Sequence, residues 1–316
     1  MSAASACHAR HSRAEIGLRA GALVVILVTS LAGTLFPVVA KRVPYLRRNV
    51  PGGLFEFLKL AGSGVILATA LIHLLEPAVD MLSADNPCVG EGWGEYPYAY
   101  GMCLAAVYFA FISNSSLRGS GTLGSRTSII LFPPLLRPSS AVAFHDAFEE
   151  NPLSTQLIAT ATLEFGICFH SVIIGITLAV TEVEEFRPLF IVLVFHQMFE
   201  GLGVGARLAA LTLPSQFAWV PWVGGVLYSV CTPVGMAVGL GIEQGLAVES
   251  TELTVTAGVM YALSAGILLY TALVELMAHE LVFNKFYQTC SIWRLSFSLV
   301  SFAVGALLMA LLGKWA

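Results

Sequence analysis

Residues 189–205 read LFIVLVFHQMFEGLGVG and carry only two ionisable side chains, His196 and Glu200. An ionisable group at the centre of a bilayer costs on the order of 2.5–3.5 kcal/mol on insertion scales, so it needs a partner or a function. Because His196 and Glu200 are four residues apart, they lie on the same face of a helix. The stretch therefore predicts a membrane-spanning helix with a polar site on one face.

The composition of the whole chain also indicates a membrane protein. Hydrophobic residues make up 57% of the 316 residues, charged residues only 11%, and the mean hydropathy is +0.80. Soluble domains carry about 25% charged residues. A membrane helix needs about 20 mostly apolar residues. The chain is therefore predicted to be an all-α, polytopic membrane protein with eight transmembrane helices, at residues 16–40, 54–78, 97–113, 155–180, 186–211, 217–242, 254–279 and 293–313.

The eight spans leave little room for a separate soluble domain, so residues 1–316 are expected to form one transmembrane domain. The longest connection, residues 114–154, begins rich in Ser and Gly and is expected to be a flexible cytosolic loop. It ends in an acidic segment with one histidine. This segment is either a cytosolic metal-binding patch or a solvated helical lead into the fourth span, and its candidate ligands are His145, Asp146, Glu149 and Glu150.

The distribution of Lys and Arg predicts the orientation of the chain in the membrane. With both termini outside, most of these residues lie in cytosolic segments, and the acidic loop 79–96 lies outside. We therefore expect a multi-pass protein of the plasma membrane with extracellular termini. The six cysteines form no CxxC pair, which argues against a disulfide framework and against a thiolate zinc site. Basic segments are short and few, so nucleic-acid binding is not expected.

His170 on the fourth span lies at the depth of His196 on the fifth. Each is ten residues from the outer end of its predicted span. At a rise of 1.5 Å per residue this is about 15 Å, the middle of a core about 30 Å thick. The short linker between these spans makes them antiparallel neighbours. Two imidazoles and a carboxylate suit Zn²⁺ or Fe²⁺, although polar contacts between two helices are the simpler alternative. We predict a metal site at His170, His196 and Glu200.

Further ionisable residues extend from this site toward both faces of the membrane. Such a series is expected of an ion pathway, whereas snorkelling to the interface is the alternative for those near the span ends. The candidates are His73 and Glu76 near the outer end of the second span, and Glu275, His279 and Glu280 near the inner end of the seventh. Three roles remain open for Glu164 on the fourth span: a second ligand, a proton-carrying group or a helix-packing contact.

The motifs around these residues resemble the ZIP (Zrt/Irt-like protein) family of divalent metal transporters, in particular its iron/zinc branch of plants, fungi and protists. The likeness covers most of the chain. It rests on the stretches ATALIHLLEPA, NPCVGEGWGEYPY, EFGICFHSVIIGITLAV, VLVFHQMFEGLGVGARL, TPVGMAVG and YTALVELMAHEL. The resemblance implies eight spans, extracellular termini, a long cytosolic loop, a homodimer and import of metal into the cytosol.

The resemblance also assigns roles to particular residues. It makes the three predicted site residues ligands, places Ser171 and Gln197 at neighbouring ligand positions, and matches His279 and Glu280 to a cytosolic exit pair. The chain departs from many members at Ile174, where a carboxylate often stands, so a single well-formed metal site is expected. The histidine-rich run that is usual in the long loop is also missing.

The implied function is transport of zinc, with iron and manganese as further candidates. The metal is transiently bound cargo, so no cofactor is expected, and the partners are the divalent ion and the lipid bilayer. The alternative is an intramembrane zinc-dependent hydrolase, which typically uses an HExxH motif. The stretch HQMFE has Gln197 in place of the catalytic glutamate and lacks the second histidine. We therefore expect that the protein is not an enzyme.

Overall fold

The computed structural model describes residues 13–314, except 85, 87, 88, 90, 130–152, 182 and 246–250. Every regular element in this part of the chain is a helix, which confirms the all-α prediction. The α-helices are α1 (Arg13–Arg42), α2 (Pro44–Asn49), α3 (Gly52–Ala68), α4 (Glu76–Met81), α5 (Tyr98–Ile129), α7 (Leu153–Val180), α8 (Val183–Ala210), α9 (Val220–Gly245), α10 (Thr251–Tyr270), α11 (Lys285–Thr289) and α12 (Ile292–Leu312). The other helices are η2 (Thr69–Leu75), η3 (Glu91–Gly94), η4 (Ser215–Phe217) and η5 (Thr271–Val282).

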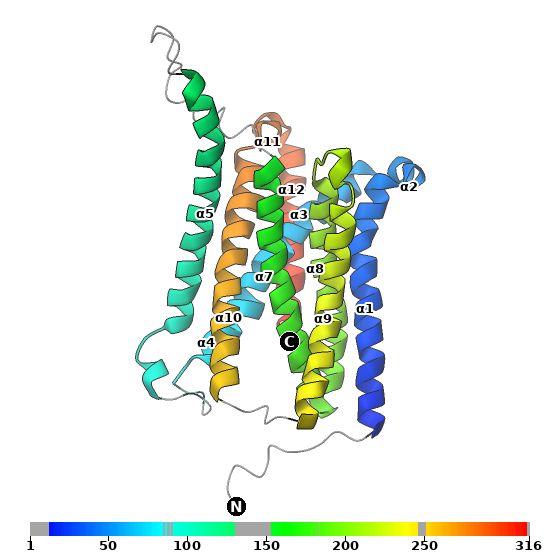
Figure 1. Ribbon diagram of the computed structural model, residues 1–316. Coiled ribbons are helices and arrows are strands. Elements are labelled where there is room, and N and C mark those ends of the chain that lie inside the picture. The colour runs from blue at the N-terminus through cyan, green and yellow to red at the C-terminus, as the bar shows by residue number, and fades with distance from the viewer. Residues whose placement is uncertain are drawn as a thin grey trace, which may run out of the picture.

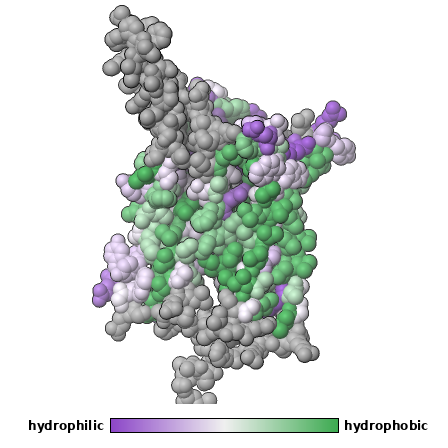
Figure 2. Space-filling view, viewed as in Figure 1, coloured by the Kyte–Doolittle hydropathy of each residue, from purple (hydrophilic) through white to green (hydrophobic). Residues whose placement is uncertain are grey.

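Seven helical segments within the described residues are long and apolar enough to cross a membrane. They are Ile16–Arg42, Gly52–Met81, Thr160–Val180, Val183–Ala210, Ser215–Gly241, Thr254–Val282 and Ile292–Leu312. The remaining predicted span corresponds to a shorter apolar helix, Tyr98–Asn114. Figure 2 shows a broad hydrophobic band across the visible face, with most of the hydrophilic residues toward its edges. The chain is therefore a multi-pass membrane protein.

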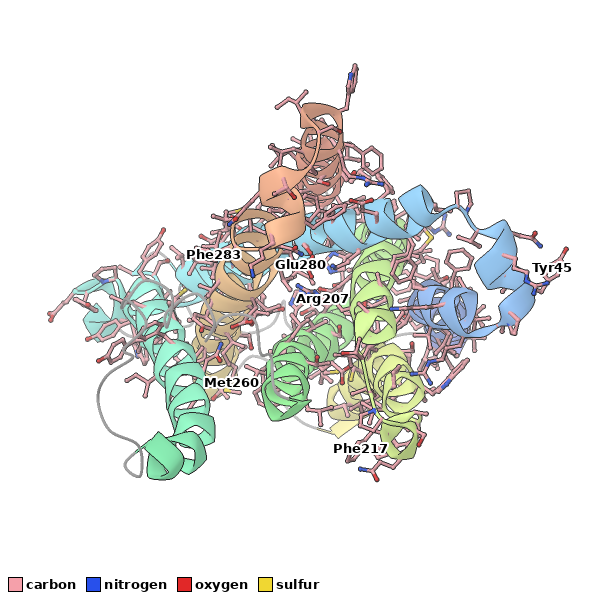
Figure 3. All side chains as sticks on the ribbon, turned by 90° about the horizontal axis from the view of Figure 1, so that it is seen from above. Tyr45, Arg207, Phe217, Met260, Glu280 and Phe283 are labelled. Atoms are coloured by element: carbon pink, nitrogen blue, oxygen red, sulfur yellow. The ribbon has the colours of Figure 1, made fainter. Side chains whose placement is uncertain are left out.

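The long helices pack as two groups. One group consists of α1, α7, α8 and α9, and the other of α3, α5, α10 and α12 (Figure 1). The groups meet mainly where α3 packs on α8 and α10 packs on α7, and Figure 3 shows this arrangement from above. A buried apolar cluster that includes Ile66, Ile167 and Leu268 joins them. We call the end at which α2 and α11 lie, the upper end in Figure 1, the inner end, after the orientation that the sequence predicts.

Two glycines allow the two groups to touch backbone to backbone. Gly62 on α3 lies against Gly203 on α8, and a Cβ atom added to Gly203 would come within 2.9 Å of the Gly62 Cα. Real Cβ atoms essentially never approach another atom this closely. Small residues at such a crossing let membrane helices pack closely. Any larger side chain at either position must push the two groups apart.

Arg19 ties the outer end of α1 to the end of α7. Its guanidinium donates to the carbonyl oxygens of Leu178 and Ala179, at 2.8 and 2.5 Å, and also to that of Thr181. The Phe186 ring lies 4.8 Å from its central carbon. The last carbonyls of a helix have no intrahelical partner, and a basic side chain can satisfy them. Arg19 therefore caps α7 and is only 1% exposed.

Two features differ from the sequence prediction. The α5 helix continues to Ile129, so residues 114–129 are helical where a flexible loop was expected, although Gly and Ser have low helix propensity. In addition, η2 and η5 are π-helical segments that interrupt the second and seventh spans. A π-helix hydrogen-bonds to the fifth residue along instead of the fourth, and such segments occur frequently at functional sites. Apolar periodicity does not reveal them.

Candidate metal centre

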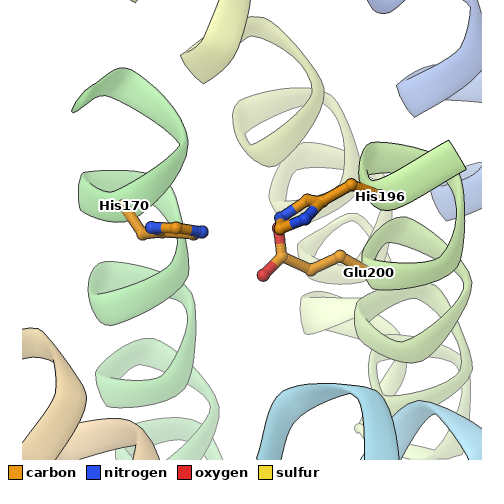
Figure 4. A group of neighbouring side chains, drawn as sticks. All are labelled: His170, His196 and Glu200. Atoms are coloured by element: carbon orange, nitrogen blue, oxygen red, sulfur yellow. The ribbon is translucent and has the colours of Figure 1, made fainter. Parts of the chain in front are cut away.

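The structure brings His170, His196 and Glu200 together between α7 and α8 (Figure 4). One ligand atom from each side chain lies within 4.8 Å of the other two. His196 Nε2 is 3.8 Å from Glu200 Oε2, because one helical turn on α8 places both side chains on the same face. All three residues are fully buried. The depth estimate from the sequence requires His170 on α7 to lie opposite His196 and Glu200 on α8. The structure places it there.

Most polar atoms of this cluster lack hydrogen-bond partners among the described residues. Both ring nitrogens of His170, both of His196 and Oε1 of Glu200 are buried without one. Buried polar groups in proteins are nearly always hydrogen-bonded, and an unpaired one costs about 1–3 kcal/mol. A cation held by the imidazole nitrogens and the carboxylate supplies the missing interaction. The donor set therefore fits a divalent transition-metal ion.

Ser171 and Gln197 extend the polar surface of the site. Both are buried, at 0% and 1% exposure. The Ser171 hydroxyl and both atoms of the Gln197 amide group also have no hydrogen-bond partner among the described residues. These atoms are available to an ion or to its water ligands. Their assignment as ligands remains a prediction.

His73 lies closer to the site than the sequence predicted. We expected it near the outer end of the second span, apart from the central cluster. Its ring centroid is instead 4.7 Å from that of His196, in an edge-to-face arrangement, while the His170 and His196 centroids are 5.6 Å apart. His73 Nε2 lies 3.2 Å from the Met309 carbonyl oxygen on α12. His73 belongs to η2, and the π-helical turn changes the direction in which its side chain points.

The other predicted pathway residues have varied surroundings. Glu76 is exposed, as expected for a group that reaches the interface. The Glu164 carboxylate packs against Gly224 on α9, and its Oε1 is buried without a hydrogen-bond partner in the described part of the chain. Glu275 accepts a hydrogen bond from Asn114 on α5. Glu280 forms ion pairs with Lys59 and Arg207, which balance its charge in this structure.

Some predicted residues lie outside the described part of the chain. The side chain of His279 is among them, although its backbone belongs to η5. So are the four candidates of the loop patch, His145, Asp146, Glu149 and Glu150. These assignments remain predictions.

Tyr228 is a site residue that sequence reasoning missed. It lies on α9, is 1% exposed, and its hydroxyl is 3.2 Å from both Glu200 Oε2 and the Gln197 carbonyl oxygen. The hydroxyl donates to either acceptor and so orients the carboxylate of the cluster. A single tyrosine in an apolar span carries no distinguishing sequence signal. Its role follows only from the packing of α9 against α8.

Comparisons with known proteins identify metal transporters that are similar to this chain. A family model described as ZIP zinc transporter matches residues 16–128 and 136–313. The chain is 37% identical to zinc-regulated transporter 1 of Saccharomyces cerevisiae, over 96% of this chain and 88% of that protein. It is 36% identical to zinc-regulated transporter 1 of Schizosaccharomyces pombe, over 96% and 86% of the two chains. It is 32% identical to Fe(2+) transport protein 2 of Oryza sativa subsp. japonica, over 97% and 88%.

Proposed function

Because the chain belongs to the ZIP zinc transporter family, we propose that it imports zinc into the cytosol through the cluster of His170, His196 and Glu200. Family membership makes the chain a transporter of divalent metal ions and not an enzyme. The relatives named for zinc and for iron(II) extend the proposed substrates to Fe²⁺. An imidazole and carboxylate site is also chemically suited to Mn²⁺.

The observation that carries this proposal is the buried cluster with its unpaired nitrogens and oxygen. Zinc binds imidazole nitrogen and carboxylate oxygen at about 2.0–2.2 Å, which puts tetrahedral ligands about 3.3 Å apart. The ligand atoms here lie within 4.8 Å of one another, so the side chains must close by up to roughly 1.5 Å around an ion. Three such ligands leave one coordination position for Ser171, Gln197 or water. Incomplete coordination suits a site that must release its ion.

The polar residues on either side of the cluster form the proposed route. His73 and Glu76 lead toward the outer end, and Glu275, His279 and Glu280 lead toward the inner end. Transporters place their binding sites near the bilayer midplane and open them alternately to each side. The proposal includes extracellular termini, a plasma-membrane location and a homodimer. These are supported by the Lys and Arg distribution and by the family resemblance.

The hydrolase alternative receives no support. Gln197 follows His196 where a zinc hydrolase of the HExxH type needs a general base. The relatives compared above carry the names of transporters. At the position where the HExxH motif has its second histidine, this chain has Glu200. Glu200 is a candidate ligand on the same helix face as His196.

The proposed function is tested by measuring uptake of labelled zinc in metal-starved cells that express the chain at the surface. We expect saturable uptake, with Fe²⁺, Mn²⁺ and Cd²⁺ competing in proportion to their affinity for the site. Cells that express no transporter provide the background. Surface-localised protein that moves neither zinc nor iron above this background contradicts the proposal.

Replacing Tyr228 by phenylalanine removes the hydroxyl that orients Glu200 and leaves the ring in place. We expect the KM for zinc to rise by about tenfold or more, because outer partners of metal ligands are typically worth 10–100-fold in affinity or activity. The matched control is Tyr108→Phe, since Tyr108 is 63% exposed on α5. Equal KM values for Tyr228→Phe and wild type exclude this orienting role.

A further inference from the structure

Three charged side chains form a cluster near the inner end, which we call the inner ion-pair cluster. Arg207 Nη1 lies 2.9 Å from Glu280 Oε1, and Lys59 Nζ lies 3.0 Å from Glu280 Oε2. In Figure 3 Arg207 and Glu280 lie next to each other at the centre of the view. The side chains of Arg207 and Glu280 are only 18% and 11% exposed. The pair is thus partly shielded from water. Opposite charges interact more strongly in such surroundings than at an open surface.

The inner ion-pair cluster connects the two helix groups. Arg207 belongs to α8 of one group, whereas Lys59 on α3 and Glu280 on η5 belong to the other. Any movement of α8 along α3 and η5 must therefore break the contact between Arg207 and Glu280. The pair of Lys59 and Glu280, in contrast, lies within one group.

Arg207 stands directly between the metal centre and the inner end. It follows Glu200 by seven residues, two turns of α8, and so lies on the same helix face at a distance of about 10 Å along the axis. An ion that leaves Glu200 along this face of α8 encounters the guanidinium before it reaches the inner surface. A positive charge at this position repels the ion unless Glu280 is available to compensate it.

The neighbouring carboxylate of Glu56 is occupied by other partners. Tyr287 donates a hydrogen bond of 2.8 Å to Glu56 Oε1, and the Ser298 hydroxyl lies 3.4 Å from the same atom. Burial, together with the nearby carboxylates of Glu56 and Glu280, raises the pKa of Tyr287 to about 12, so its phenol remains a donor at neutral pH. Glu280 is therefore the carboxylate that both cations of the cluster share.

We propose that Arg207 is a release gate: it holds the Glu280 carboxylate at rest, yields it to a departing metal ion, and then displaces that ion toward the inner surface. The inference rests on the proposed function, because it assigns a step to the imported ion. It gives Glu280 two alternating partners, the guanidinium and the metal. It also gives Arg207 a role in release and none in binding at the central site.

The proposal predicts a separation between turnover and apparent affinity. Without the competing guanidinium, the ion leaves Glu280 slowly, so Arg207→Gln is expected to lower kcat for zinc uptake per surface transporter by about tenfold. The KM should stay within about twofold of wild type, because the central cluster is intact. Arg207→Lys keeps the charge and should retain most of the turnover. Both kinetic constants are measured from zinc-dependent uptake rates normalised to surface-labelled protein.

A matched control and a charge exchange complete the test. Arg48→Gln makes the same substitution at an exposed arginine on α2, outside the cluster, and should leave kcat unchanged. Exchanging the charges in Arg207→Glu/Glu280→Arg should restore a substantial part of the turnover lost in Arg207→Gln. If Arg207→Gln does not reach the surface, Glu280→Gln tests the same contact, since it removes the carboxylate and should also lower kcat at constant KM.

Two results overturn the release gate. One is a kcat of Arg207→Gln within about twofold of the wild-type value. Where Glu280→Gln replaces that variant, the same limit applies to its kcat. The other is a KM that rises in step with the loss of turnover, as expected if the contact only supports the central site. Wild-type uptake is the reference in each series. Its absence contradicts the proposed function itself, whereas equal rates in wild type and variants contradict the gate alone.

Discussion

Replacing His196 by alanine is expected to reduce zinc uptake by at least about 100-fold, to the background of cells without the transporter. Loss of a partner that merely orients a ligand already costs about 10–100-fold, and His196 is a proposed ligand. The variant retains His170 and Glu200 but loses one of the three buried ligands, which leaves two positions of a tetrahedral shell open. The measurement is initial uptake of labelled zinc per surface-labelled molecule.

The effect of His196→Ala must be separated from misfolding. His196 is fully buried with both ring nitrogens unpartnered in the described part of the chain, so its removal takes away an unfavourable polar group. We therefore expect the metal-free Tm of the purified variant to match or exceed that of wild type. The increase in Tm on adding zinc should disappear, since a ligand at 100 times its Kd stabilises by about 2.7 kcal/mol.

Phe195→Ala is the matched control for His196→Ala. Phe195 precedes His196 on α8 but is 46% exposed on the apolar surface. Zinc uptake by the Phe195→Ala variant should remain near that of wild type. A folded His196→Ala variant that transports zinc as well as this control would exclude His196 from the site, whatever the fate of the other ligands.

Introducing valine at Gly203 is expected to reduce uptake by at least about tenfold and to lower the Tm. A Cβ atom at this position meets the Gly62 backbone at 2.9 Å, and backbone cannot rotate away as a side chain can. Inserting extra atoms into a well-packed interior typically costs about 1–3 kcal/mol, and here the two helix groups must separate to admit them. Uptake and thermal unfolding in detergent measure the two consequences.

Gly21→Val provides the control for the glycine substitution. Gly21 lies on α1, and no atom stands within 4 Å of a Cβ added there. The same change in helix propensity is therefore made without the steric conflict. Wild-type uptake by Gly203→Val would mean that α3 and α8 do not need this close approach.

The pairing of His170 with the α8 residues could be predicted because it depends on local rules. The fourth and fifth spans are joined by a short linker, so counting residues from that linker gives equal depths for His170 and His196. The spacing of His196 and Glu200 then fixes their common face. The structure brings the three side chains together as this counting requires.

The surroundings of the cluster could not be predicted in the same way. Tyr228 reaches Glu200 from α9, and Arg207 and Lys59 reach Glu280 from α8 and α3. These contacts join residues far apart in sequence, and no periodic pattern encodes them. The position of His73 depends on the π-helical segment η2, whereas a depth estimate assumes regular α-helix throughout. Span lengths and helix faces are local properties, but partner choice is a property of the packed bundle.

The two π-helical segments also affect how the length of this chain can change over evolution. Removing one residue from an α-helix rotates everything beyond it by about 100°, which turns a buried face toward lipid. A π-helical turn already contains a residue in excess of the α-helical repeat. A one-residue deletion inside η2 or η5 can therefore be absorbed locally, with the flanking helices kept in register. Single-residue gaps between this chain and its relatives are thus structurally tolerable in the second and seventh spans, and far less so in α8, which carries His196, Glu200 and Arg207 on one uninterrupted helix.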